Sequence, residues 1–222
     1  MIYRVTHAVI LTLVRLIWRP TVEGREHIPE TGPLIVASNH LSFIDSILIP
    51  LVVPRKVVFL AKAEYWEGRS PAAWPRRLFF WLFEAVPVQR ELQQDAQASL
   101  GLARGVLERG HAFGIYPEGT RSRDGRLYRG RTGVGWLALA ADATVVPVGL
   151  IGTNQVQPIG ARVPRIRRVT VRFGEPVRPA DYRTMAPGRA RREITDTVMD
   201  RIAALTGQVR TEVYNTHAGT VD

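Results

Sequence analysis

Short apolar runs alternate with segments of helical periodicity along this chain, and this alternation constrains its fold more than any other feature. An apolar run of roughly four to eight residues predicts a buried strand, and strands alternating with helices predict a parallel sheet. The expected strands are Leu34 to Ala37, Val57 to Leu60, Ala112 to Tyr116, Thr144 to Leu150 and Val169 to Phe173. The expected helices follow Ser42 and cover Pro75 to Glu84, Asp95 to Glu108, Thr132 to Ala140 and Pro187 to Leu205. With 222 residues, enough for one well-packed core, we predict a single α/β domain with a mostly parallel central sheet flanked by helices.

The first twenty residues are apolar but interrupted by charge at Arg4 and Arg15. Such a stretch is too short and too charged to span a bilayer, which takes about 20 mostly apolar residues. An apolar face nevertheless remains on a helix, formed by Ile2, Val5, Val9, Leu13, Leu16 and Ile17. We interpret residues 1 to 20 as an amphipathic helix in a membrane interface and residues 21 to 222 as the domain, with a helix packed on the core as the alternative.

Composition limits the chemistry. There are 30 Lys and Arg against 20 Asp and Glu, so the formal charge of +10 indicates an anionic partner such as a phosphorylated substrate or an anionic membrane surface. Nucleic acid is disfavoured, because no zinc-finger spacing, RNP-like run or heptad-linked basic helix is present. The absence of cysteine excludes disulfides, thiolate metal sites and a cysteine acyl-enzyme, and we expect neither a metal nor a bound cofactor.

A histidine and an aspartate five residues apart follow the first expected strand. His40 lies before a helix start at Ser42, and Asp45 lies in its first turn. On one continuous helix the two would point about 140° apart, but across a strand-to-helix turn they can meet. A carboxylate on one imidazole nitrogen prepares the other to take a proton from an alcohol. The alternative is that Asp45 only caps the helix and His40 is a loop histidine.

A second candidate segment follows the expected strand that ends at Tyr116. A Pro-Glu-Gly-Thr turn is followed by a crowded set of arginines, which are Arg121, Arg123, Arg126, Arg129 and Arg131. A bound phosphate would relieve their mutual repulsion, with Thr120 and backbone N–H groups as further donors. A solvated basic loop is the alternative.

Together these segments resemble the glycerolipid acyltransferase family, which includes the 1-acylglycerol-3-phosphate acyltransferases, from about Val22 to Val177. The first block of that family is matched by Asn39, His40 and Asp45, the second by Arg90, the third by Tyr116 to Ser122, and the fourth by Val146 to Val148. Gln89 stands where the family commonly has an acidic residue, and Arg129 where it usually has lysine. The resemblance implies His40 and Asp45 as catalytic residues and, as substrate-binding residues, Asn39, Arg90, Glu118, Gly119, Thr120, Arg121 and Arg129.

The resemblance also implies a function. We expect direct acyl transfer from acyl-CoA, or from acyl-carrier protein, to the free hydroxyl of a lysophospholipid, 1-acyl-glycerol-3-phosphate, by a peripheral (monotopic) protein on the cytoplasmic face of the cell membrane. Other acceptors stay open, namely glycerol-3-phosphate, another lysophospholipid or an amino-acid lipid. A further alternative is that the protein is not an enzyme but a basic module that binds anionic membranes. The sequence specifies neither the chain length of the donor nor the oligomeric state.

Overall fold

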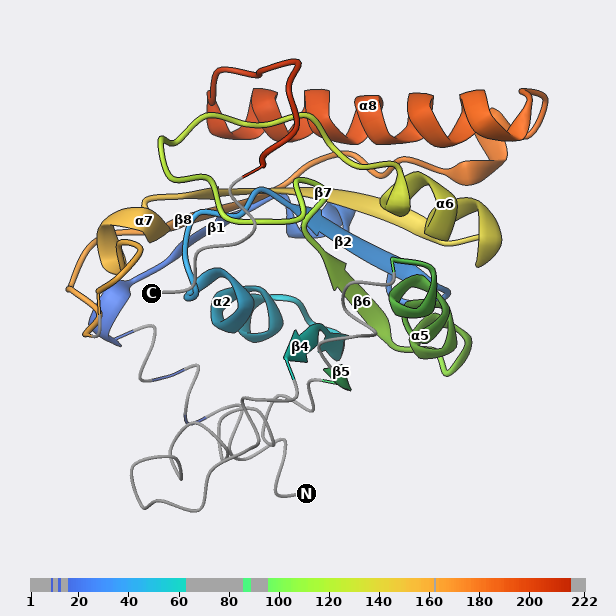
Figure 1. Cartoon of the computed structure of the whole chain (residues 1–222). Coiled ribbons are helices and arrows are strands. Elements are labelled where there is room, and N and C mark those ends of the chain that lie inside the picture. The colour runs from blue at the N-terminus through green and yellow to red at the C-terminus, as the bar shows by residue number, and fades with distance from the viewer. Residues whose placement is uncertain are drawn as a thin grey trace.

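A six-stranded sheet forms the middle layer of the domain, in the order β1-β8-β7-β2-β6-β3 (Figure 1). The structure is a computed structural model, which describes residues 9, 12, 16–62, 86–88, 96–161 and 163–216. The strands of this sheet are β1 (Thr21–Glu23), β2 (Leu34–Ser38), β3 (Val57–Val58), β6 (Ala112–Ile115), β7 (Thr144–Ile151) and β8 (Thr170–Phe173). Four of its five pairings are parallel, and only β7 and β8 are antiparallel. The predicted mostly parallel sheet is therefore confirmed.

Helices cover both faces of the sheet, because the buried strands are apolar on both sides. In β2, Leu34 and Val36 belong to a core cluster with α2, whereas Ile35 and Ala37 belong to a second cluster with α5, α6 and α8. Figure 1 shows α8 and α6 above the sheet and α2 below it. The helices are α2 (Asp45–Val52), α5 (Ala96–Glu108), α6 (Gly133–Ala140), α7 (Thr153–Val156) and α8 (Pro187–Thr206), with short 3₁₀ turns η1 (Arg25–His27) and η4 (Pro179–Tyr182). The domain thus has the helix–sheet–helix layers expected of an α/β fold.

Most expected elements appear within a residue or two of their predicted bounds. The last helix begins at Pro187 and is followed by Gly207, whose φ of 72° ends it in the left-handed conformation. The strand expected from Val57 to Leu60 is instead divided at Phe59, since β4 (Leu60–Lys62) leaves the main sheet and pairs in parallel with β5 (Val86–Val88). The helix expected from Pro75 to Glu84 lies outside the described residues.

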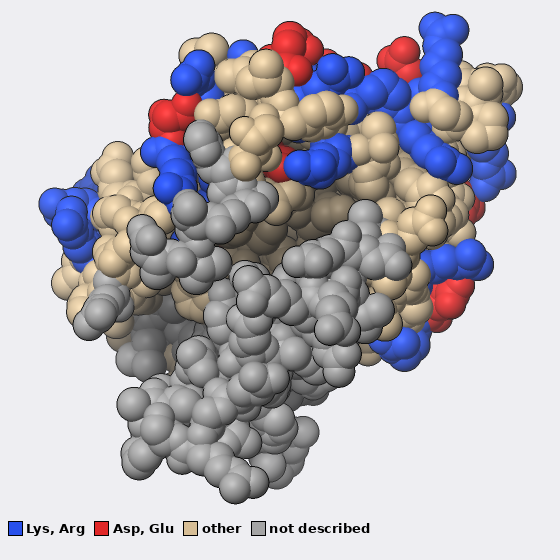
Figure 2. All heavy atoms as spheres, viewed as in Figure 1, with Lys and Arg blue, Asp and Glu red and all other residues tan. Residues whose placement is uncertain are grey.

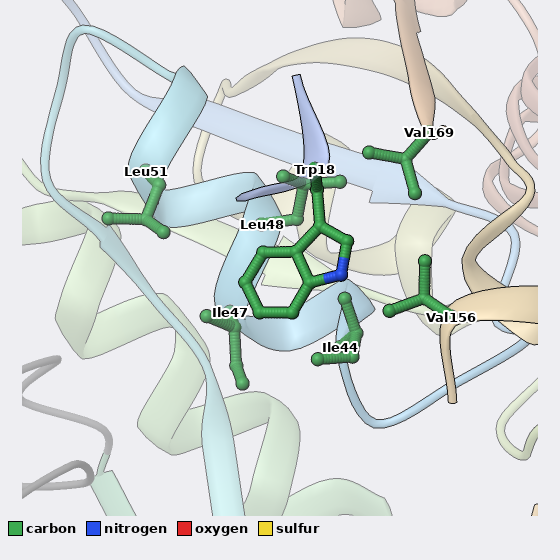
Figure 3. A pocket seen from close by; sticks show the side chains of 7 residues that line it. All are labelled: Trp18, Ile44, Ile47, Leu48, Leu51, Val156 and Val169. Carbon is green, nitrogen blue, oxygen red and sulfur yellow. The ribbon is translucent and has the colours of Figure 1, made fainter. Parts of the chain in front are cut away.

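The described part of the N-terminus is helical at residues 9, 12 and 16–18. Leu16 and Ile17 are exposed, whereas Trp18 packs against α2. Figure 3 shows the Trp18 indole ring in an apolar pocket among side chains of α2 and the side chains of Val156 and Val169. In the described part of the chain, no helix is both long and apolar enough to cross a membrane. An interfacial helix over residues 1 to 20 stays a prediction.

Candidate active site

The turn between β2 and α2 brings His40 and Asp45 together. β2 ends at Ser38 and α2 begins at Asp45, so the two side chains approach across the turn at the carboxyl end of a parallel strand. The His40 Nδ1 to Asp45 Oδ2 distance is 2.9 Å. Asp45 is fully buried, and 16% of the His40 side chain is exposed. The expected contact between the two side chains is therefore present.

The same carboxylate oxygen also stabilises the turn. Asp45 Oδ2 accepts hydrogen bonds from the backbone N–H groups of Leu41, at 2.7 Å, and Ser42, at 2.8 Å. The regular α-helix begins two residues later than a cap at Ser42 requires, because the first hydrogen bonds after Ser42 span three residues. The Asp45 N–H donates to the Ser42 carbonyl at 3.2 Å and the Ser46 N–H to the Phe43 carbonyl at 3.3 Å. The bond from the Ser42 N–H to Asp45 is nevertheless the one that a capping box predicts. Asp45 thus acts as a cap and contacts His40 at the same time.

An aromatic stack fixes the plane of the imidazole. The Tyr116 ring lies 3.8 Å from the His40 ring at an interplanar angle of 8°. The Phe59 and Tyr116 rings also stack, with their centroids 5.4 Å apart, and the Tyr116 hydroxyl lies 2.8 Å from Ser46 Oγ. Burial, and then the charge of Asp45, raise the pKa of Tyr116 well above 10, so its ring stays neutral. Nε2 of His40 has no hydrogen bond from the described residues.

Glu118 joins the second motif to the first. Its carboxylate accepts the backbone N–H of His40 at 3.3 Å and that of Tyr128 at 2.9 Å. In return, the Ser122 N–H donates to the His40 carbonyl at 2.8 Å. Only 1% of Glu118 is exposed, and this burial outweighs its hydrogen bonds and raises its pKa from 4.5 to about 7. The structure thus gives Glu118 a positioning role, and its direct contact with substrate stays a prediction.

The turn after Glu118 is the predicted phosphate site. Gly119 has a φ of +81°, and a Cβ there would lie 3.1 Å from Arg131 Nε, so the Arg131 side chain lies over the turn. Thr120 is partly exposed and Arg121 is exposed, so both are accessible to a ligand. Phosphate binding by Gly119, Thr120 and Arg121 stays a prediction.

The arginines beyond the turn divide into two kinds. Arg126 forms an ion pair with Asp124 at 2.7 Å. Arg129 and Arg131 instead face the ring of Tyr214, with their guanidinium carbons 5.3 and 5.6 Å from its centroid. The density of arginines predicted an anion site, but it did not indicate which of them are already paired. Arg131 therefore joins Arg121 and Arg129 as a candidate phosphate ligand.

Asn39 is buried, and its side chain is engaged by the protein. Its carbonyl oxygen accepts the Leu150 N–H at 2.8 Å, and its amide donates to the Leu150 carbonyl at 2.9 Å and to Gln208 Oε1 at 2.8 Å. These bonds extend the pairing of β2 and β7 by one residue, and a substrate contact stays a prediction. Arg90 lies outside the described residues. No group of three His, Asp or Glu within the described ranges is placed to hold a metal ion.

Three residues near the site were missed as site residues. Tyr116 was recognised only as the aromatic position of a motif, and its stack on His40 could be seen only once β2 and β6 were paired. Gln208 and Tyr214 carry no sequence signal, because they reach the site through the folding of the chain after α8.

Comparison with known proteins identifies relatives of this chain. The model of the family described as Acyltransferase matches residues 19–151. The 1-acyl-sn-glycerol-3-phosphate acyltransferase alpha of Mus musculus is 30% identical over 132 residues, which are 59% of this chain and 44% of that protein. The 1-acyl-sn-glycerol-3-phosphate acyltransferase of Cocos nucifera is 30% identical over 167 residues, 73% of this chain and 51% of that protein. The chain therefore spans about half the length of these curated relatives.

A solved structure shares the fold. The crystal structure of the 1-acyl-sn-glycerophosphate acyltransferase PlsC from Thermotoga maritima matches with a TM-score of 0.65 and 24% sequence identity, over 90% of this chain and 80% of that one. The matched family segment contains the His40 and Asp45 pair and the Glu118 to Arg121 turn, which the fold joins through the His40 backbone. The chain thus belongs to the Acyltransferase family.

Proposed function

We propose that this protein transfers a fatty acyl group from acyl-CoA to the free hydroxyl of 1-acyl-glycerol-3-phosphate, forming phosphatidic acid. The observation that carries the proposal is the 2.9 Å contact from His40 Nδ1 to Asp45 Oδ2, which leaves Nε2 without a hydrogen bond from the described residues. A carboxylate on Nδ1 selects the tautomer in which Nε2 can accept a proton. The names of the relatives support this choice of acceptor.

The proposed reaction is a single displacement. The acceptor hydroxyl gives its proton to His40 Nε2 as its oxygen attacks the thioester carbonyl, so one C–O bond forms. The C–S bond then breaks, and the CoA thiolate takes this proton from the imidazolium. Asp45 stabilises the imidazolium between these two steps, and a positioned base of this kind contributes about 10²- to 10⁴-fold.

The acceptor phosphate would bind on the arginine side of the site. Arg121 and Arg131 are exposed and Arg129 is partly exposed, so a phosphate can reach all three. Arginine binds phosphate through two parallel hydrogen bonds, which orients the ligand as well as holding it. This arrangement would present the free hydroxyl of the lysophospholipid to His40.

The test is acyl transfer by the purified full chain, with lysophosphatidic acid and acyl-CoA. We expect His40→Ala to lower kcat at least about 100-fold, because it removes the base. His27→Ala is the matched control, since this histidine lies in η1 and binds the Phe173 carbonyl through Nδ1. Arg121→Ala should raise KM for the acceptor.

Three outcomes would overturn the proposal in part or in whole. Full activity of His40→Ala would remove the general base. If the parent acylates glycerol-3-phosphate or another lysophospholipid but not lysophosphatidic acid, the chemistry stands and the acceptor is wrong. A folded parent that binds anionic vesicles and turns over no acyl donor would support the non-enzymatic alternative.

We also propose peripheral association with anionic membranes, on the cytoplasmic face where acyl-CoA is found. The loop after α7 exposes Val163 by 74% and Ile166 by 71% beside the basic residues Arg165, Arg167 and Arg168. Figure 2 shows Lys and Arg side chains gathered at the left edge of the molecule, on the side where this loop runs in Figure 1. Exposed apolar side chains between cations are typical of a surface that enters the headgroup region.

This loop is joined to the exposed end of the N-terminal segment. Trp18 Nε1 donates to the Arg165 carbonyl at 2.9 Å, and Ser42 Oγ donates to the Gln157 carbonyl at 2.7 Å, so the loop begins beside the active-site turn. We expect the Val163→Asp, Ile166→Asp double variant to sediment less with vesicles containing anionic lipid. The Val209→Asp, Val213→Asp double variant is the control, because these valines are 71% and 63% exposed elsewhere and the change in net charge is the same. An equal loss of vesicle binding in both variants would show that membrane association depends only on net charge.

A further inference from the structure

The chain that follows α8 returns across the predicted phosphate site. We call residues Gln208 to Asn215 the C-terminal strap; it lies beyond the matched family segment, which ends at residue 151. Its backbone pairs with residues 121 to 131, which we call the arginine loop. Leu127 N–H donates to the Val209 carbonyl at 3.0 Å, Thr211 N–H to the Leu127 carbonyl at 2.9 Å, and Arg129 N–H to the Val213 carbonyl at 3.0 Å. The backbone of the arginine loop is therefore held by the strap on one side.

Two side chains of the strap connect the parts of the site. Gln208 Oε1 accepts the Asn39 amide at 2.8 Å, and its Nε2 donates to the Gly125 carbonyl at 2.7 Å. Gln208 thus bridges the residue before His40 and the arginine loop. Asn215 is 1% exposed and donates to the Arg121 carbonyl at 3.2 Å.

Tyr214 contacts the arginines themselves. The guanidinium carbons of Arg129 and Arg131 lie 5.3 and 5.6 Å from the centroid of its ring, within the range of a cation–π interaction. Two cations on one ring repel each other, so the arrangement is most favourable when an anion lies between or beside them. Tyr214 remains 41% exposed, which leaves room for a ligand on this surface.

We infer that the C-terminal strap is part of the acceptor site and that Tyr214 is a positioning residue, which holds Arg129 and Arg131 in the orientation that binds the acceptor phosphate. The inference rests on the proposed function, since it assigns the residues that orient the phosphate ligands. Tyr214 acts through the arginines and touches no reacting atom. Its loss therefore weakens the binding of the phosphorylated acceptor and leaves the chemical step unchanged.

The test compares steady-state kinetics of the full chain with those of Tyr214→Ala, Tyr214→Leu and Tyr214→Phe. We expect the alanine and leucine variants to raise KM for lysophosphatidic acid about three- to tenfold, a range that corresponds to losing one or two such contacts. KM for acyl-CoA and kcat should stay within about twofold. The Tyr214→Phe variant keeps the aromatic ring and should keep the parental KM for lysophosphatidic acid. Tyr182→Ala controls for lost stability, because it truncates a tyrosine in η4 whose hydroxyl binds Thr197 on α8.

The outcomes separate this inference from the proposed function. A parental KM in the leucine variant, or an equal change in KM for both substrates, would overturn the role of Tyr214. Calorimetric titration with lysophosphatidic acid measures the same contact without turnover. If the parent transfers no acyl group but binds this lipid more tightly than Tyr214→Leu does, the proposed function fails and the positioning role stands. Equal binding by the two would refute the positioning role.

Discussion

Asp45 performs two tasks that substitution can separate. Its Oδ2 accepts the N–H groups of Leu41 and Ser42, which are 6% and 0% exposed, as well as contacting His40. Removing this acceptor in Asp45→Ala leaves two buried donors unpaired, at about 1–3 kcal/mol each, so the free energy of unfolding should fall by roughly 2–6 kcal/mol. A domain of this kind is stable by only about 5–15 kcal/mol in total.

Asp45→Asn should behave differently. The amide oxygen can replace Oδ2 toward all three donors, and the amide nitrogen then takes the position of Oδ1, which has no partner among the described residues. Hydrogen bonds to a neutral acceptor are about half as strong, so we expect a loss of roughly 1–2 kcal/mol. The charge that stabilises the imidazolium is nevertheless gone. We therefore expect kcat to fall by about 10²-fold or more.

The assay pairs urea unfolding with acyl-transfer kinetics on the same preparations. The matched control is Asp142→Asn, which alters an exposed ion pair with Arg183 and should change stability by less than about 0.5 kcal/mol. If Asp45→Asn keeps kcat within threefold of the parent while Asp45→Ala unfolds easily, Asp45 is only a cap. Parental stability of Asp45→Ala would refute the hydrogen-bond argument.

Three further substitutions test the structure around His40. Tyr116→Leu removes the ring that stacks on His40 at 3.8 Å and should lower kcat about tenfold, because the base is then misplaced. Tyr116→Phe keeps the ring and should keep the parental kcat. Equal kcat values in these two variants would contradict the positioning role of the stack. Burial raises the pKa of Glu118 from 4.5 to about 7, so the unfolded chain loses this proton at a lower pH than the folded chain does. The free energy of unfolding should therefore fall as the pH rises from about 4.5 to 7, by about 3 kcal/mol in all. Urea unfolding across this range should show a flatter dependence in Glu118→Gln, and an unchanged slope would refute the assignment. Gly114→Ala places a Cβ 2.2 Å from the Phe59 ring and should cost about 1–3 kcal/mol by thermal unfolding; a parental Tm would show that the ring can move aside.

The parts of the site that depend on local geometry could be predicted from the sequence. The apolar run that ends at Ser38 and the helix that contains Asp45 are short-range signals, and together they imply a strand-to-helix turn. A turn of this kind can bring residues five apart into contact, so the contact between His40 and Asp45 could be predicted from the sequence, beside the alternative that Asp45 only caps the helix. The placement of both motifs at carboxyl strand ends followed from the parallel sheet in the same way.

The parts of the structure that depend on pairing between distant segments could not be predicted from the sequence. β8 runs antiparallel to β7, yet its apolar pattern is that of a strand in either direction. The strand predicted from Val57 to Leu60 is divided at Phe59, whose ring stacks on Tyr116 and lies over Gly114, and both of these residues are more than fifty positions away. The strap is a further example, since a backbone segment that pairs with a loop needs no apolar or charged pattern of its own.

The two motifs form one structural unit around the main chain of His40. The N–H of this residue is bound by Glu118 and its carbonyl by Ser122, and these two residues flank the turn that contains Gly119, Thr120 and Arg121. The predicted phosphate site and the base are therefore attached to the same few backbone atoms. Because this connection is short and hydrogen-bonded on both sides of His40, the fold holds the turn at a fixed distance from the main chain of His40. Under the proposed function, this fixed separation favours an acceptor whose phosphate and free hydroxyl lie the same distance apart.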